Sequence, residues 1–589
     1  MHNTSKFIQN FFYLLSGVAA VAWVSVLLWA SNKGFDITDE GFYMYKYSDL
    51  NTSKVSYTNF HLIQKFLFPF IEPTVQNLRI EKLLLCIAGA AAFTAAIEGY
   101  CRQVLQVIIQ KRETILLGIL IFSGFTLTYA FGPQTPAYNF FSSFFITLAS
   151  SLFIIDISKK HETRWVILIY LLIGALCQLL FQVKFSNAII AAFVFIDFYL
   201  LYNLIALPNK LAVIKQTFLR LVLMLTGFFI FHILFCGGVE AAIEFSKSQF
   251  SGITELKGYD SNTLIATYLS TFTTVFDSLC TLKFILVCLS LAGIVYGQAK
   301  NNQYVFYSSI ILQALAIFRF KLYYGGEANK TEQTIIYLLW IIAFLVIFLI
   351  QQKRNNSANR PVQLQRILFA LFLFFIPFAG ALGTNNKLHI QVIFYIPFWM
   401  ALLYIQAINS RLQEKMVTVV TFLSVLAMLQ SLDSVLNHPY RINGGLFAQN
   451  ESSTIGKENL MIDKACSESI AAIDSVLKVS NIKDNDYLFC FSDLAGLGYV
   501  LYQPIIPHGN GWFNPGDIEH NCSLLKKLHK AEPHSRVIFI LDSRYPAQSD
   551  SLVKYWTELK NNPESYIKTA EIRVSFSNDP HNLSIYVPR

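Results

Sequence analysis

The chain has 589 residues, of which 54% are hydrophobic and only 14% are charged, and its formal net charge is +9 at pH 7. A soluble globular chain does not need that much apolar surface, so the composition excludes an ordinary soluble protein and favours a polytopic membrane protein. The positive charge does not require a nucleic-acid partner, because the positions of the basic residues explain it as a signal of membrane topology.

Apolar segments long enough to cross a bilayer, roughly 17 to 25 residues each, follow one another along most of the chain. We count thirteen, at 11–30, 80–100, 114–131, 137–157, 165–183, 186–206, 218–237, 283–299, 303–320, 334–350, 366–383, 389–407 and 415–433. Only Lys6 supplies positive charge ahead of the first segment, and no small-residue cleavage site stands out after it. We therefore expect a retained helix and not a signal peptide.

The basic residues predict the orientation of these segments. Lys and Arg concentrate in the short loops of one side, such as the loop with Lys111 and Arg112, and basic residues of membrane proteins stay in the cytoplasm. The short loops of the other side hold only Lys184, Arg319, Lys321, Lys330 and Lys387. We therefore expect a protein of the inner (plasma) membrane, with its N-terminus in the cytoplasm and its C-terminus outside.

The composition changes after residue 433, where a turn-rich linker with Asn443-Gly444-Gly445 leads into a more highly charged tail. The tail pattern predicts a helix, two buried strands and a closing pair of strands, at 464–478, 487–491, 537–542, 572–576 and 583–587. The expected domains are thus a transmembrane domain, 1–433, and an extracytoplasmic α/β domain, 434–589. Cys466, Cys490 and Cys522 permit one disulfide in the tail without requiring it.

Two adjacent carboxylates, Asp39 and Glu40, open the loop that follows the first apolar segment, and aromatic residues flank them. Such rings favour the headgroup layer, so the carboxylates are expected at the membrane surface. Later in the same loop, residues 57–67 form an amphipathic stretch that is expected to lie along the membrane plane. An acidic pair in this place is more often a solvated loop start than a catalytic pair.

This layout resembles the GT-C glycosyltransferases. The chain shares with that family one helix, a loop that opens with Asp39-Glu40-Gly41-Phe42-Tyr43, an in-plane segment, a dozen more helices and an exported domain. Within the family it looks most similar to the branch of aminoarabinose transferases and protein O-mannosyltransferases, and oligosaccharyltransferases are more distant. The resemblance implies transfer of a sugar from a polyprenyl-phosphate-linked donor to a lipid, glycan or protein acceptor at the outer face of the membrane. Membrane lipids are then the other expected partner.

The resemblance also implies roles for individual residues. Asp39 matches the catalytic acid that orients or deprotonates the acceptor, Glu40 matches its partner, and Tyr43 completes the motif as a substrate-binding candidate. The chemistry agrees, because a hydroxyl that attacks an anomeric carbon needs a carboxylate base within hydrogen-bond reach. The departing lipid phosphate needs cations.

The candidates for those cations are the basic residues at the exterior ends of segments, namely Lys184, Arg319, Lys321 and Lys387, with His389 beside the last. For each of them alone, snorkelling to the interface is the simpler interpretation. Arg319 ranks first, because it lies innermost and because a guanidinium can grip phosphate oxygens in a fork. The expectation is a shared exterior cavity that holds Asp39 and Arg319.

One departure from the family concerns a metal ion. Relatives often carry a second acidic residue in the exterior loop between helices three and four, but residues 131–139 of this chain contain none. No metal ligand is therefore assigned, although Glu240, Glu244 and Glu327 are possible substitutes and a divalent cation stays open. The sequence identifies neither the sugar nor the acceptor.

Two other functions compete. A transporter or flippase for lipid-linked sugars would show inverted repeats and charges at the membrane midplane, and only Asp197 lies at such a depth. A polysaccharide polymerase or ligase also uses a polyprenyl-linked donor, but it would depend on exterior Arg and His in long loops more than on an early acidic pair.

Overall fold

The computed structural model describes most of the chain. The described residues are 2–51, 58–159, 162–254, 261–325, 329–354, 360–384, 386–409, 413–483, 486–492, 494–507, 513, 517–560, 566–576 and 580–589. The chain forms two compact units that are each discontinuous in sequence. The helical unit contains Met1–Ser25, Leu83–Phe131 and Tyr138–Asp433, and the tail unit contains Val26–Lys82, Gly132–Ala137 and Ser434–Arg589.

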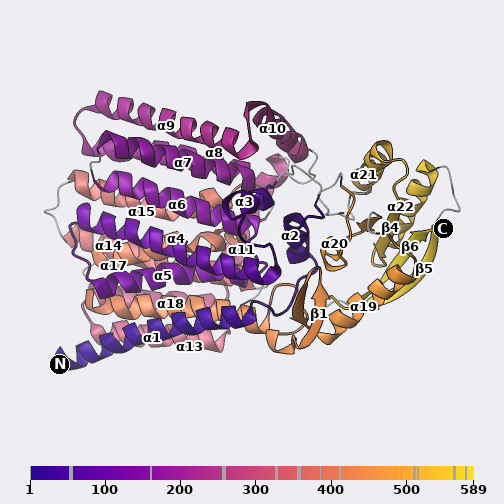
Figure 1. Cartoon of the computed structure of the whole chain (residues 1–589). Helices are drawn as coiled ribbons and strands as arrows, with labels where there is room; N and C mark the ends of the chain where they lie inside the picture. The colour runs from indigo at the N-terminus through magenta and orange to yellow at the C-terminus, as the bar shows by residue number, and fades with distance from the viewer. Residues whose placement is uncertain are drawn as a thin grey trace. The chain divides into compact units, whose positions relative to one another are not determined.

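The helical unit is a bundle of long helices (Figure 1). Its helices are α1 (His2–Ala30), α4 (Val75–Gln103), α5 (Lys111–Ala130), α6 (Tyr138–Ser158), α7 (Thr163–Val183), α8 (Phe185–Ala206), α9 (Lys210–Cys236), α10 (Val239–Thr254), α11 (Ser261–Leu279), α12 (Leu282–Ala299), α13 (Gln303–Arg319), α14 (Lys330–Arg354), α15 (Arg360–Ala381), α16 (Leu388–Val392), η2 (Ile393–Tyr395), α17 (Ile396–Asn409) and α18 (Gln413–Asn437). Three of them, α1, α4 and α18, begin in one unit and end in the other.

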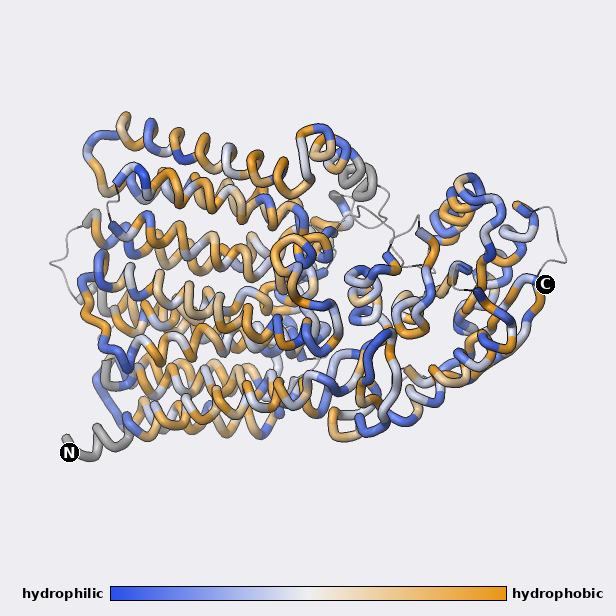
Figure 2. Tube along the Cα trace, in the orientation of Figure 1, coloured by the Kyte–Doolittle hydropathy of each residue, from blue (hydrophilic) through white to orange (hydrophobic). Residues whose placement is uncertain are grey.

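Among the described residues, 12 helices are long and apolar enough to cross a membrane. Each corresponds to one of the thirteen predicted segments, which confirms the expected polytopic membrane protein. The remaining predicted segment, 303–320, is α13, a helix of 17 residues that falls short of the others in length. Figure 2 shows the hydrophobic residues along the helices of this unit and the hydrophilic ones gathered at the turns between them.

Close backbone packing joins α7 to α9. A Cβ added at Gly174 would lie 2.1 Å from the carbonyl oxygen of Met224, and one added at Gly227 would lie 2.2 Å from that of Leu171. Small residues at such contacts let membrane helices approach closely.

The acid buried among these helices is Asp156, which pairs with Arg220 on α9 at 3.0 Å, whereas Asp197 is exposed on α8.

The tail unit contains the α/β domain expected at the C-terminus. Its sheet has the order β3-β4-β6-β5, in which β3 and β4 are parallel and the other pairs antiparallel, and β1 and β2 form a separate hairpin. The elements are η3 (Leu446–Ala448), β1 (Glu451–Ile455), β2 (Glu458–Ile462), α19 (Lys464–Val479), β3 (Tyr487–Cys490), α20 (Leu497–Val500), α21 (Ile518–Ala531), β4 (Val537–Asp542), α22 (Pro546–Leu559), β5 (Tyr566–Val574) and β6 (His581–Pro588).

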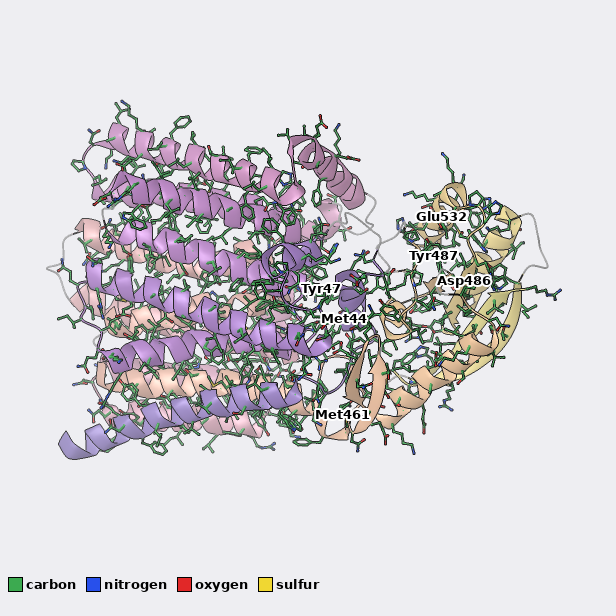
Figure 3. All side chains as sticks on the ribbon, in the orientation of Figure 1. Met44, Tyr47, Met461, Asp486, Tyr487 and Glu532 are labelled. Atoms are coloured by element: carbon green, nitrogen blue, oxygen red, sulfur yellow. The ribbon has the colours of Figure 1, made fainter. Side chains whose placement is uncertain are left out.

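The predicted helix and strands of the tail are all present. Every residue of β4 is buried, as its uninterrupted apolar run predicts for a central strand. Polar side chains close the start of the parallel pair, where the Tyr487 hydroxyl donates to Glu532 at 3.2 Å and Arg536 pairs with Asp486 at 3.3 Å (Figure 3). The three cysteines of the tail are free thiols, so the permitted disulfide is not formed.

The loop after α1 belongs to the tail unit and carries two short helices, α2 (Asp39–Tyr47) and α3 (Phe60–Leu67), the second of which lies within the predicted amphipathic stretch. Backbone bonds tie the start of this loop to β2, since the Met461 amide donates to the Asn32 carbonyl at 2.9 Å and the Gly34 amide to the Met461 carbonyl at 2.7 Å. Figure 3 marks Met44 and Tyr47 on α2 and Met461 on β2.

Two glycines allow α2 to touch α20. A Cβ added at Gly41 would lie 2.7 Å from the Cα of Gly496, and one added at Gly496 would lie 1.9 Å from the Ile37 carbonyl oxygen. No larger residue fits at either position without moving backbone. The short helix with the predicted acidic pair is therefore seated directly on the C-terminal domain.

Candidate functional site

Asp36 organises the first turn of α2. Its carboxylate accepts hydrogen bonds from the Thr38 amide at 2.8 Å, the Thr38 hydroxyl at 2.6 Å, the Asp39 amide at 3.1 Å and the Glu40 amide at 3.2 Å. These bonds satisfy amides that have no partner within a helix at its N-terminus. Burial raises the pKa of Asp36, and the neighbouring Asp39 carboxylate adds to that rise. Asp36 therefore holds Asp39 and Glu40 in a fixed geometry.

Glu40 points into the protein and binds Arg79. The guanidinium donates from Nη2 to Glu40 Oε2 at 2.6 Å and from Nε to Oε1 at 3.0 Å, and the two side chains are only 2% and 1% exposed. The Thr135 amide also donates to Glu40 Oε1 at 3.2 Å. Arg79 donates further to the carbonyls of Lys33 and Gly34, each at 2.8 Å. Glu40 thus ties together α2, the start of α4 and the 132–137 loop.

Asp39 has a different environment. The Tyr440 hydroxyl donates to Asp39 Oδ2 at 2.5 Å, and the Arg441 guanidinium lies 3.6 Å from the same oxygen. Arg441 also donates to the Thr38 hydroxyl at 3.0 Å, which fixes its direction. The Asp39 side chain is 21% exposed, and no described residue donates to its Oδ1. One carboxylate oxygen is therefore held and the other is available.

Tyr43, the third predicted residue of the motif, lies one turn after Asp39. Its ring is buried and meets the ring of Phe60 on α3 edge to face, with centroids 5.1 Å apart. Tyr47 packs on the same ring at 5.4 Å. These contacts hold α2 against α3, and the role of Tyr43 in substrate binding stays a prediction.

The predicted cation Lys184 lies in the helical unit, between α7 and α8. It is only 5% exposed, its ammonium has no hydrogen-bond partner among the described residues, and the ring of Tyr138 lies 5.3 Å away. Burial lowers the pKa of Lys184 to about 7. A buried ammonium without an acceptor is costly, and an anionic group of a ligand would relieve that cost.

The other predicted cations of the helical unit differ from Lys184. Arg319 and Lys321 are exposed at the end of α13, where the Lys321 ammonium lies 5.1 Å from the ring of Tyr324. Lys387 donates to the Thr274 hydroxyl at 2.8 Å, and His389 Nε2 lies 2.9 Å from the Thr331 hydroxyl. The structure gathers Asp39, Glu40 and Tyr43 on α2, and the pairing of Asp39 with Arg319 stays a prediction.

A divalent metal does not fit the carboxylates around α2. Both oxygens of Asp36 and both oxygens of Glu40 accept hydrogen bonds, so of the three carboxylates in the first turn only Asp39 has an available oxygen, and Mg²⁺ or Ca²⁺ needs several oxygen ligands. The described residues contain no group of three or more His, Cys, Asp or Glu side chains that could hold a metal. Of the proposed substitutes, Glu240 and Glu244 lie on α10, and Glu327 lies outside the described residues.

Sequence reasoning missed the residues that hold the acidic pair. Asp36 precedes the motif by three positions, Arg79 lies at the edge of the second apolar segment, and Tyr440 and Arg441 follow the last one. A basic residue at the boundary of an apolar segment is a weak signal, because snorkelling explains it equally well. The chain offers no stronger signal for these contacts.

Comparisons with known proteins find structural similarity only. No family model matches the chain, and no curated protein matches its sequence. The fold is similar to the oligosaccharyltransferase of Archaeoglobus fulgidus in its apo form, with 11% identity over 96% of this chain and 73% of that one and a TM-score of 0.43. It is also similar to ArnT from Cupriavidus metallidurans in the apo state, with 13% identity over 98% of both chains and a TM-score of 0.43. For ArnT bound to undecaprenyl phosphate, the identity is 11%, again over 98% of both chains, and the TM-score is 0.38.

Proposed function

We propose that this protein is a GT-C-type glycosyltransferase that moves a sugar from a polyprenyl-phosphate-linked donor to an acceptor at the outer face of the inner membrane. The observation that carries the proposal is the state of Asp39. One oxygen of its carboxylate is fixed by Tyr440, and the other has no donor among the described residues. The described residues of this protein include 12 helices fit to cross a membrane, so we interpret Asp39 as a carboxylate prepared for an acceptor at a membrane surface.

The proposed reaction is a displacement at the anomeric carbon. The acceptor hydroxyl or amine gives its proton to Asp39 Oδ1 while its lone pair forms the new bond to the anomeric carbon. The bond from that carbon to the donor phosphate oxygen breaks, and the phosphate leaves with the electron pair. Negative charge from Asp39 favours the oxocarbenium-like transition state.

Tyr440 and Arg441 are positioning residues in this scheme. The hydroxyl of Tyr440 fixes Oδ2, so the free oxygen keeps one direction toward the acceptor. Glu40 has no such freedom, because Arg79 and the Thr135 amide occupy its oxygens. We therefore propose that Glu40 supports the site by holding the loop and does not receive the proton.

The leaving phosphate needs a cation, and Lys184 has the strongest support among the predicted ones. Its buried ammonium lacks an acceptor among the described residues, whereas Lys387 already donates to Thr274 and Arg319 is exposed. A phosphate oxygen would supply the missing acceptor. Substitution by methionine keeps the length of the side chain, so Lys184→Met is expected to raise the KM for the donor more than it lowers kcat.

The test is a transfer assay on purified full-length protein with a panel of polyprenyl-phosphate sugars. We expect Asp39→Asn to lower turnover by about 10²- to 10⁴-fold, the usual range for loss of a general base. Asp49→Asn is the matched control, because Asp49 is an exposed acid in the same loop, and it should keep turnover within about twofold. A folded Asp39→Asn variant with wild-type turnover would remove Asp39 from the reaction.

A further inference from the structure

One aromatic side chain of the tail unit is exposed although residues on both sides of it are buried. Phe447 lies in the middle of η3 and is 71% exposed, whereas Leu446 is fully buried and Gln449 is 1% exposed. Among the described residues after 433, the other exposed large hydrophobic side chains are Val479 and Ile567, and neither is aromatic. A single exposed apolar residue is common, so the surroundings of Phe447 decide what it means.

The backbone around Phe447 is firmly held. The side-chain amide of Gln449 donates to the Asn443 carbonyl at 2.7 Å. A Cβ added at Gly445 would lie 2.6 Å from the carbonyl oxygen of Leu436, in the last turn of α18. η3 is therefore packed against the end of α18, and the exposure of Phe447 belongs to a well-packed segment.

The ring of Phe447 meets the last turn of α1. Its centroid lies 5.3 Å from that of Trp29, which is itself 42% exposed, and the preceding Leu28 is 48% exposed. The Lys33 ammonium lies 4.9 Å from the Trp29 ring and donates to the Gln449 carbonyl at 3.5 Å. We call Leu28, Trp29 and Phe447 the aromatic patch, and Lys33 lies at its polar edge.

The aromatic patch lies where two membrane spans end. These spans are Gln9–Ala30 in α1 and Val417–Asn437 in α18, and the ends of both belong to the tail unit. Val18 is 56% exposed and precedes Trp29 by about three turns, which places both side chains on the same face of α1. Trp29 therefore continues the lipid-facing surface of a spanning helix, and Phe447 extends that surface onto the C-terminal domain.

We propose that the aromatic patch docks the tail unit on the headgroup layer of the lipid bilayer. Aromatic rings favour this layer, where an apolar body meets a wet edge. Lys33 fits the same layer, because a lysine can lay its stem along apolar surface and keep its ammonium in water. The partner is thus a lipid surface, and the proposal does not depend on the proposed function.

Such a dock would join the bilayer surface to the sheet of the C-terminal domain. Gln449 ties η3 to Asn443, and the Asn443 side chain donates to the Ser575 carbonyl at 2.7 Å, directly after β5. The Ser575 amide in turn donates to the Ser469 hydroxyl on α19 at 3.0 Å. Contact of Phe447 with lipid would therefore restrain α19 and the sheet through hydrogen bonds.

The test places a tryptophan at the patch, in full-length protein reconstituted at one copy per nanodisc of phosphatidylcholine. Discs with and without bromine on the lipid acyl chains are compared, and the emission of the seven native tryptophans is subtracted. Bromine quenches only rings that touch lipid, so Phe447→Trp should lose about half of its emission. Phe447 is exposed, so this change should leave the fold intact.

Two further variants set the scale. Val21→Trp places the probe on the exposed side of α1, where Val21 is 68% exposed, and gives the loss of emission for full lipid contact. Val479→Trp is the matched control, because Val479 is 81% exposed at the end of α19, which leads away from β1 (Figure 1). It should lose no emission.

Quenching of Phe447→Trp close to that of Val21→Trp would support the dock. Quenching of Phe447→Trp no stronger than that of Val479→Trp would overturn it. A blue-shifted but unquenched Phe447→Trp, together with dimers in larger discs, would also overturn it and would assign the patch to a second copy of the chain.

Hydrogen exchange in the same nanodiscs gives a second measurement. Phe447→Asp puts a carboxylate at the patch, so η3 should lose its contact with lipid and its amides should exchange about tenfold faster. Phe447→Leu keeps an apolar side chain without the ring and should exchange as the wild type does. Exchange as fast in Phe447→Leu as in Phe447→Asp would show that the stack on Trp29, and not lipid, holds η3, and would overturn the dock.

Discussion

The two sides of the first turn of α2 differ although adjacent residues supply them. On one side, Glu40 is sealed from solvent and both of its oxygens bind Arg79. On the other side, Asp39 is partly exposed and only one of its oxygens is held, by Tyr440. Successive residues of a helix point about 100° apart, so neighbours in sequence can serve opposite purposes. The Glu40 side holds the loop together, and the Asp39 side is proposed to react.

The largest expected effect comes from the Glu40 side. Arg79→Met leaves the Glu40 carboxylate buried without its partner, and breaking one half of a buried pair costs about 3–5 kcal/mol. Thermal unfolding in detergent would measure this loss. Arg573→Met is the control, because Arg573 is exposed on β5 of the same unit.

The double variant Glu40→Gln with Arg79→Met sharpens this result. It should recover part of the stability lost in Arg79→Met, because the unpaired charge is gone. A wild-type unfolding midpoint in the single variant would show that the Glu40 side does not hold the loop.

The second effect concerns the opposite end of the same helix. Because burial lowers the pKa of Lys46 to about 8, against about 10.4 in the unfolded chain, its charged form costs about 3 kcal/mol in the native state at pH 7. Lys46→Met should therefore be more stable than the wild type at pH 7. The wild type should gain stability as the pH rises from about 8 to about 10.4, and the difference between the two should shrink there. Unfolding midpoints of the wild type and Lys46→Met across this pH range provide the measurement. A difference between the two midpoints that does not change with pH would contradict the lowered pKa of Lys46.

The third effect tests the Asp39 side through activity and not through stability. Tyr440→Phe removes the hydroxyl that fixes Asp39 Oδ2 and keeps the ring. We expect kcat to fall about tenfold, which corresponds to about 1.4 kcal/mol, with an unchanged KM for the donor. Steady-state kinetics would measure kcat and the KM for the donor separately. A rise in KM with constant kcat would place Tyr440 at the donor and not at the base.

The smallest effect concerns the hydroxyl that links Asp36 to Arg441. Thr38→Val keeps the shape of the side chain and removes the bonds to both neighbours. We expect a loss of about 1 kcal/mol in stability, the usual net contribution of a hydrogen bond, together with a small fall in kcat. Thr38→Ser is the control, because it retains the hydroxyl and should behave as the wild type does.

Much of the fold could be predicted, because apolar length and strand-like runs are local properties of the sequence. The membrane helices, α19 and the buried strand β4 follow from such runs. The position of Asp39 and Glu40 was also readable, since both follow the first apolar segment. The different environments of these two residues could not be predicted from the sequence, because Tyr440 is some four hundred positions away from Asp39 in the chain.

The burial of basic residues was the other property that could not be predicted from the sequence. Lys184 and Arg319 both lie at ends of apolar segments and are equivalent as sequence signals, yet the structure buries the first and exposes the second. Lys46 lies within a run of aromatic residues and gave no signal of its own. Burial of a long cationic side chain depends on which helices meet around it, and pattern reasoning does not supply that information.

The contact of Gly41 with Gly496 makes the position of the proposed base depend on the C-terminal part of the chain. The helix that carries the proposed base rests on a segment made after every membrane span has been synthesised. A truncated polypeptide that ends with the last membrane span is expected to insert normally but to lack the proposed transfer activity. Proteolytic removal of residues 434–589 is therefore expected to stop the proposed reaction while the membrane helices stay intact.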